Sequence, residues 1–230
     1  TAGLFMPISV PVEPNGVELS PIRMTDFHTT PETDPESGWP VIGDDGLARP
    51  PWAATDPLLR EYYDTEWGMP VTDEQGMLER VCLEGFQVGL SWRLILQKRE
   101  ALRAAFRGFN PEEVAGMSIE HLLDDASLIR NRRKLEAAVK NAQATLDLRE
   151  QGTHLGEFVW SYQPEHTPVP RTMAEVPTRS AESEQLAKDL KKRGFTFVGP
   201  VTMYALMEST GIVDTNLVGT WRRGASGVWA

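Results

Sequence analysis

Residues 126–135 read Ala-Ser-Leu-Ile-Arg-Asn-Arg-Arg-Lys-Leu, a short basic stretch between two segments with helical spacing of apolar side chains. The clearer of the two is a helix predicted over residues 134–150, whose apolar face carries Leu135, Ala138, Val139, Ala142 and Leu146. A shorter helix is expected to end near Leu123. Asn131, a residue type that tolerates the left-handed conformation, lies in the middle of the predicted turn. The stretch therefore predicts a helical hairpin near residues 125–135.

The hairpin is strongly basic. Arg130 precedes Asn131 at the turn, and Arg132, Arg133 and Lys134 follow it. Exposed backbone amides beside several cations are typical of a phosphate-binding element. The alternative is a solvated charge cluster, which is what most such runs are.

The rest of residues 49–230 is expected to be mostly helical. The spacing at Thr72 to Gln75 is that of a capping box, and Gly85 is a plausible helix stop. Residues 153–179 contain four prolines and are interpreted as a loop. Further helices are predicted over residues 92–107, from Pro111, over 182–193 and over 200–210.

Length and composition fit one globular domain with an additional N-terminal segment. The chain has 230 residues, of which 40% are hydrophobic and 24% charged, with a net charge of −10. Residues 1–48 contain eight acidic side chains, one basic side chain and seven prolines, which predicts an extended arm. Such an arm either lies along the body or forms a floppy tail. The body, residues 49–230, is nearly neutral, so a local basic patch on it is compatible with the overall charge.

Several classes of protein are excluded by what the chain lacks. It has no run of 18 apolar residues and no basic segment followed by an apolar one at its start, so neither a membrane helix nor a signal peptide is expected. One cysteine, Cys82, excludes an intrachain disulfide. The four histidines have no paired spacing, which predicts no metal site. A cytoplasmic location is the simplest expectation.

Glu84, in the stretch Leu-Glu-Gly-Phe-Gln-Val-Gly-Leu-Ser-Trp of residues 83–92, is the first candidate for a functional side chain. It is predicted to lie in the last turn of a helix, where a carboxylate faces the negative end of the dipole. A cation should offset that position. Either a cationic ligand or a salt bridge to Arg93 or Arg99 would do so.

Aromatic residues are dense on both sides of Glu84. The cluster consists of Trp52, Tyr62, Tyr63, Trp67 and Trp92. Aromatic rings with polar edges suit a pocket for a flat heterocycle, which they stack on and bind at its edge. The alternative is ordinary core packing.

These features together resemble one known family, the bacterial DNA-3-methyladenine glycosylase I family. The resemblance extends from about residue 51 to 219, and residues 1–48 have no counterpart in it. It is carried by Asp56-Pro57-Leu58, Asp64-Thr65-Glu66-Trp67-Gly68, Leu83-Glu84-Gly85, Gly89-Leu90-Ser91-Trp92, Lys98-Arg99-Glu100, Ile129-Arg130-Asn131-Arg132, Phe158-Val159-Trp160 and Lys191-Lys192-Arg193-Gly194-Phe195.

The resemblance implies a mainly α fold, the helix-hairpin-helix DNA glycosylase fold, with two helical lobes and the base pocket between them. It implies that N3-methyladenine is flipped out of alkylated duplex DNA and released as free 3-methyladenine, leaving an abasic site. The family's base-recognising and catalytic Glu corresponds to Glu84, and its pocket aromatics to Tyr62, Trp92 and Trp52. The DNA-binding residues implied are Gly89, Leu90, Arg130, Asn131, Arg132 and Lys134.

The resemblance implies a mechanism that needs no cofactor. The protein is expected to be a monomer, and no membrane is expected among its partners. 3-Methyladenosine carries a positive charge on its base, so a buried Glu84 would bind it better than neutral adenine. Helix-hairpin-helix glycosylases in general use an Asp to assist the attacking water. The first Asp after the hairpin is Asp147, well along the next helix, which fits a family that lacks this residue.

The chain departs from the family's best-known members at their structural zinc site. The corresponding positions here are Pro50, Tyr63, Asn216 and Thr220, none of which is a usual zinc ligand. We therefore expect metal analysis of the purified protein to find no stoichiometric zinc. Apolar packing of the aromatic residues near Trp52 against the segment around Trp221 is expected to close the two ends of the domain instead.

Two other functions stay open at this stage. One is a helix-hairpin-helix DNA-binding protein without activity, which would not need Glu84, Tyr62 and Trp92. The other is a glycosylase for another alkylated purine, for which Phe86, in place of a polar residue, and the missing zinc ligands leave room.

Overall fold

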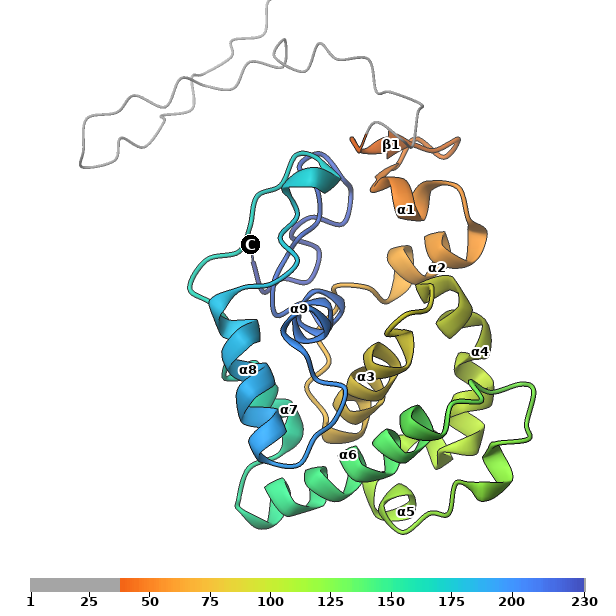
Figure 1. The fold of residues 1–230 in the computed structure, drawn as a ribbon. Helices are drawn as coiled ribbons and strands as arrows, with labels where there is room; N and C mark the ends of the chain where they lie inside the picture. Colours follow the sequence, from red (N-terminus) through yellow and green to blue (C-terminus); the bar gives the residue numbers. More distant parts are fainter. Residues whose placement is uncertain (1–37, 230) are drawn as a thin grey trace, which may run out of the picture. The chain divides into compact units, whose positions relative to one another are not determined.

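The computed structural model describes residues 38–229, and most of the predicted arm therefore lies outside the described residues. Within them the chain is mainly helical, as predicted (Figure 1). The α-helices are α1 (Pro51–Ala54), α2 (Pro57–Thr65), α3 (Glu74–Gln87), α4 (Trp92–Ala105), α5 (Pro111–Ala115), α6 (Arg132–Glu150), α7 (Leu155–Trp160), α8 (Ala181–Lys192) and α9 (Pro200–Ser209). Short 3-10 helices are η3 (Arg107–Phe109), η4 (Glu120–Leu122) and η5 (Met173–Glu175).

A small β-hairpin precedes the helices. β1 (Val41–Ile42) pairs antiparallel with β2 (Ala48–Arg49). Arg49 is almost fully buried and its guanidinium pairs with Asp45 at 2.6 Å and with Asp64 of α2 at 2.8 Å. This hairpin is therefore tied to α2 by a buried cation, and the described end of the predicted arm lies against the helical body.

Helix α3 lies at the centre of the helical body. It packs against α6 on one side and α9 on another, while α4 and α7 also contact it. Its buried side chains include Met77, Leu78, Val81 and Leu83. Cys82 is buried in the same core, and burial raises the pKa of its thiol to about 12. Residues near the end of α3 are therefore held by packing on several sides.

Two of the predicted helix boundaries are wrong at α3. Asp73, not Thr72, caps its start, because the Asp73 carboxylate accepts from Gly76 N at 2.7 Å. Gly85 does not stop the helix, which continues to Gln87. A Cβ at Gly85 would lie 3.2 Å from that of Phe197, so glycine here permits close packing inside the helix.

The predicted hairpin near residues 125–135 differs from the expected turn in one respect. Asn131 has a φ of −126° and is extended, so the expectation of a left-handed turn residue is wrong. Its side chain instead accepts from Lys134 N at 3.3 Å and caps α6. From α4, Lys98 Nζ donates at 3.0 Å to the carbonyls of Ala126 and Ser127 and holds the start of the hairpin.

Residues 153–179 are not wholly a loop, because α7 lies inside this segment. The helix has two turns and no side-chain cap at His154, so local sequence signals are weak. Trp160 Nε1 donates to Val71 O at 2.7 Å, which fixes the helix to the chain before α3. Tertiary contact, and not local propensity, accounts for this helix.

Candidate functional site

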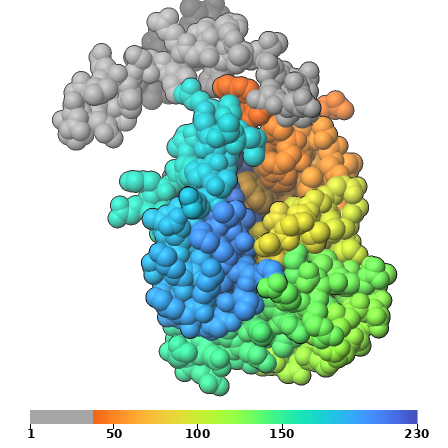
Figure 2. Space-filling view, in the orientation of Figure 1, coloured from red at the N-terminus to blue at the C-terminus, as the bar shows by residue number. Residues whose placement is uncertain are grey.

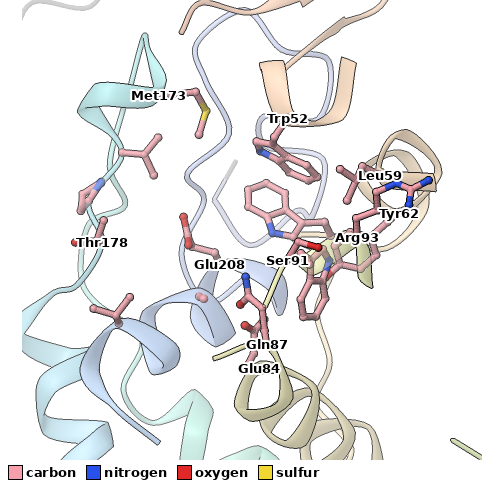
Figure 3. Close-up of a pocket in the computed structure, with 16 residues that line it drawn as sticks. Trp52, Leu59, Tyr62, Glu84, Gln87, Ser91, Arg93, Met173, Thr178 and Glu208 are labelled. Atoms are coloured by element: carbon pink, nitrogen blue, oxygen red, sulfur yellow. The ribbon is translucent and has the colours of Figure 1, made fainter. Parts of the chain in front are cut away.

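A cavity of about 470 Å³ opens between α1 and α2 on one side and α9 with the η5 segment on the other. The surface is hollowed where the orange and cyan segments face each other (Figure 2). Four predicted pocket residues line it together: Trp52, Tyr62, Glu84 and Trp92 (Figure 3). They come from α1, α2, α3 and α4, so the fold assembles the cavity from four helices.

Glu84 lies in the last turns of α3 and is 4% exposed. Its Oε1 accepts from Ser209 Oγ at 3.3 Å. Burial raises the pKa of Glu84 to about 8, and repulsion from Glu208 adds to the effect, whereas Ser209 and Arg80 act in the opposite direction. The carboxyl group is therefore costly to ionise in the empty protein, and a cation in the cavity would lower that cost.

The alternative of a salt bridge at Glu84 is wrong. Arg93 pairs with Asp56 at 2.5 Å, and Arg99 pairs with Glu66 at 2.7 Å. Within residues 38–229, no ion pair involves Glu84. The buried carboxylate that the sequence singles out thus faces the cavity without a cationic partner from the described chain.

Tyr62 is buried beside Glu84 and is held by two arginines. Arg80 Nη1 donates to its hydroxyl at 3.4 Å, and the guanidinium groups of Arg80 and Arg99 lie about 6 Å from its ring centroid. Burial raises the pKa of Tyr62, so its phenol stays protonated. Both arginines also bind Glu66, which fixes their positions behind the ring.

The aromatic walls are formed mainly by tryptophans. Trp92 is the first residue of α4, after the cap Ser91, and its ring lies 5.4 Å from that of Tyr62, centroid to centroid. Its indole N–H is buried and has no acceptor among the residues that the structure describes. Trp52 contacts Trp67 edge to face at 5.6 Å. These rings give a flat guest apolar faces and one free donor.

Of the lining residues that were not among the predicted site residues, three bear on the chemistry of the cavity: Trp67, Gln87 and Glu208. Trp67 belongs to the aromatic cluster that the sequence shows. Glu208 is the only charged residue of α9, a signal that could have marked it as a candidate although not placed it in the cavity. Phe86 does not line the cavity but is buried against Phe106, with ring centroids 5.9 Å apart. The argument for another substrate from Phe86 therefore loses its basis.

The loop between α3 and α4 carries Gly89 and Leu90 at the edge of the cavity. Gly89 has a φ of +75°, which favours glycine, and Leu90 is 36% exposed. Lys134 lies under this loop. Its Nζ donates to Phe86 O at 2.7 Å and to Val88 O at 2.5 Å.

The hairpin cations differ in their surroundings. Arg130, Asn131, Arg132 and Arg133 are exposed, whereas Lys134 is 8% exposed. The expectation that Lys134 contacts phosphate is therefore wrong, because its ammonium is buried on backbone carbonyls. Arg132 pairs with Glu120 at 2.6 Å. Among the described residues, no ion pair involves Arg130 or Arg133.

The four positions that correspond to the family's zinc ligands form no cluster of metal-binding side chains. Within the described part of the chain, no group of three His, Cys, Asp or Glu residues could hold a metal ion. Tyr63 Oη donates to Asn216 Oδ1 at 2.7 Å, and Asn216 Nδ2 donates to Asp214 Oδ1 at 2.9 Å. Arg222 reaches the carbonyls of Asp64 and Trp67 at 2.8 and 2.9 Å. The two ends are thus joined by hydrogen bonds. The expected apolar packing around Trp221 stays a prediction, since the Trp221 side chain is 38% exposed and its indole donates to Asp64 Oδ1 at 3.2 Å.

Comparison with known proteins agrees with the geometry. A family model described as methyladenine glycosylase matches residues 52–223. DNA-3-methyladenine glycosylase 1 of Escherichia coli (strain K12) is 44% identical over 174 residues, which cover 73% of this chain and 92% of that protein.

Solved structures show the same similarity. A 3-methyladenine DNA glycosylase I (TAG) superposes with a TM-score of 0.72 at 40% identity, covering 75% of this chain and 97% of the other. A tyrosine-to-phenylalanine variant of 3-methyladenine DNA glycosylase I in complex with 3-methyladenine has a TM-score of 0.70 at 34% identity, covering 74% and 94%. The family, the helical fold and the glycosylase activity implied by the sequence are confirmed: the chain belongs to the methyladenine glycosylase family of DNA glycosylases.

Proposed function

We propose that this DNA-3-methyladenine glycosylase binds the flipped, positively charged base in the cavity of Glu84, Tyr62, Trp92 and Trp52. The observation that carries the assignment is Glu84, a carboxylate buried at 4% exposure among aromatic rings without an ion-pair partner in the described chain. A cationic purine supplies the missing charge and the exocyclic N–H donor, and its flat ring fits the aromatic walls.

Hydrolysis follows from the charge on the base. Methylation at N3 makes the base a good leaving group, so the N-glycosidic bond breaks with its electron pair on the departing base. The base leaves neutral, and water adds to C1′ and releases one proton. Glu84 stabilises the positive charge on the sugar and base as the bond breaks, because its negative charge is fixed in a site of low dielectric. The products are free 3-methyladenine and an abasic site.

The exposed loop and hairpin would hold the duplex. Leu90 is exposed on the loop beside the cavity and would fill the gap that a flipped nucleotide leaves. Arg130, Asn131, Arg132 and Arg133 lie on the exposed hairpin at the start of α6, where cations and backbone N–H groups suit phosphate oxygens.

The decisive experiment is base release from freshly methylated duplex DNA. We expect release of 3-methyladenine and little release of 7-methylguanine, with the strand left unbroken at the abasic site. Chromatography of the released bases measures both activities in one reaction. If purified protein at high concentration released no base, the proposal would be wrong, and a DNA-binding protein without activity would be the better description.

The double substitution of Arg130 and Arg133 by Ala is expected to weaken binding to any duplex. Each lost phosphate contact should lower the slope of log K against log salt by about 0.9. Arg132→Ala is the matched comparison, and we expect a smaller change because Arg132 is already paired with Glu120. Fluorescence anisotropy across a salt series measures both. Equal slopes for the double variant and the unmodified protein would exclude this hairpin as the anchor.

No helix within residues 38–229 is long and apolar enough to cross a membrane. The predictions of a monomeric, cytoplasmic protein and of a zinc-free domain stay predictions.

A further inference from the structure

A second carboxylate, Glu208, faces the cavity that holds Glu84. It lies near the C-terminal end of α9 and lines the cavity from the wall opposite α2 (Figure 3). Its Oε1 accepts from Thr215 Oγ1 at 2.6 Å, which orients the side chain. The neighbouring residue, Ser209, donates to Glu84. The end of α9 thus contacts Glu84 in two ways: Ser209 donates a hydrogen bond to it, and the carboxylate of Glu208, one residue earlier, repels it.

The arginines near the cavity form ion pairs with acidic residues other than Glu84 and Glu208. Arg80 and Arg99 bind Glu66 at 3.1 and 2.7 Å, and Arg93 binds Asp56. Within residues 38–229, neither Glu84 nor Glu208 takes part in an ion pair. Glu208 accepts a hydrogen bond from the hydroxyl of Thr215, and it is near enough to the phenol of Tyr204 and the carboxyl of Glu84 to raise the pKa of both groups. The amide side chain of Gln87 lines the same cavity.

We propose that Glu208 is a second base-recognition residue, and that its carboxylate and that of Glu84 together form a two-acid site for the cationic purine. The inference rests on the proposed function of the cavity and extends it to a residue on a different helix. One acid suffices to balance a single positive charge. The second adds to the effect of burial on the pKa of Glu84 and so shifts the pH at which the site becomes charged.

The electrostatics of the pair determine the sign of that dependence. Burial raises the pKa of Glu208 to about 7, and the hydrogen bond from Thr215 acts in the opposite direction. The pKa of Glu84 is raised by burial and, in addition, by the nearby charge of Glu208. Both acids therefore lose their charge as the pH falls from above 8 toward 6. A cationic base favours the charged forms, so its binding should release a proton from the pair near neutral pH.

Glu208→Gln tests the proposal because it removes the charge and keeps an oxygen that can accept from Thr215. Single-turnover excision of 3-methyladenine would be measured from pH 5.5 to 9.5. Without the like charge of Glu208, Glu84 should ionise at a lower pH. The rise of the excision rate on the acidic side of the pH profile should therefore move to lower pH by about one unit. On the alkaline side the variant has one negative charge fewer and should be slower, by roughly 3- to 10-fold. The two profiles are therefore expected to cross.

Glu165→Gln, which removes an exposed acid outside this cavity, is the control and should leave the profile unchanged. A structural role for Glu208 would slow the reaction at every pH without moving the midpoint, and that result would overturn the proposal.

Should Glu208→Gln fold poorly by circular dichroism, Thr215→Val is the second variant. It keeps both carboxylates but removes the hydrogen bond that lowers the pKa of Glu208, so it should move the pH profile to higher pH. An unmoved profile there also counts against the proposal. Release of base by the unmodified protein with no effect of either variant refutes only the role of Glu208, whereas no release at all refutes the proposed function itself.

Discussion

Glu84→Gln should weaken recognition of the methylated base by at least about tenfold while leaving the shape of the cavity intact. The carboxylate is 4% exposed and has a single hydrogen-bond donor, Ser209, so the substitution removes a buried charge without breaking an ion pair. Loss of a charge-assisted hydrogen bond should cost about 1.5–3 kcal/mol in binding free 3-methyladenine, or roughly 10- to 150-fold. Excision should fall further, since the base in DNA is a full cation. Titration calorimetry and base release measure the two effects.

The pH dependence of this difference provides an internal control. The raised pKa of Glu84, about 8, means that its charged form is lost as the pH falls. The unmodified protein and the Gln variant should therefore become more alike toward pH 6 and differ most near pH 9. Free-base binding that is identical in the two proteins at pH 9 would show that the base does not contact Glu84.

Lys134→Met is the substitution with the next largest expected effect. Its ammonium is nearly buried and donates to the carbonyls of Phe86 and Val88, where α3 ends and its last carbonyls lack helical partners. Hydrogen bonds to a charged group contribute about 1.5–3 kcal/mol each, so the loop with Gly89 and Leu90 should lose its fixed conformation. We expect excision to fall at least tenfold, with a lower melting temperature.

The same substitution should leave the affinity for undamaged duplex and its salt slope almost unchanged, because Lys134 is not exposed to phosphate. Lys140→Met, at an exposed lysine of the same helix, is the matched control. A salt slope that falls for Lys134→Met but not for the control would instead identify Lys134 as a phosphate contact. Single-turnover excision and anisotropy on the same samples separate the two roles.

Much of the fold follows from local patterns along the chain. The apolar stripe from Leu135 predicts α6, and Pro200 at the first position predicts the start of α9. Gly85 shows where such reasoning fails. A glycine near a helix end usually marks a stop, but here it makes room for Phe197, which is distant in sequence. No local signal contains that contact.

In the candidate site, too, some residues could be identified from the sequence and others only from the structure. Glu84 could be singled out because a carboxylate at the negative end of a helix needs an explanation, and the family resemblance supplied one. Whether Glu84 had a salt bridge required the positions of Arg93 and Arg99, which are set by Asp56 and Glu66. Glu208 could not be placed in the cavity because the face that α9 presents to α3 depends on how the two helices pack.

The burial of Cys82 has a consequence for the conditions in which the protein works. Its substrate arises when electrophiles attack DNA, and the same reagents attack thiolates in proteins. The chain has a single thiol, which lies in the core with its pKa raised to about 12, so hardly any of it is in the reactive form. The ends of the domain are joined through Tyr63 and Asn216 and not through thiolate side chains. The repair protein is thereby protected at its thiol from the chemical stress that makes repair necessary.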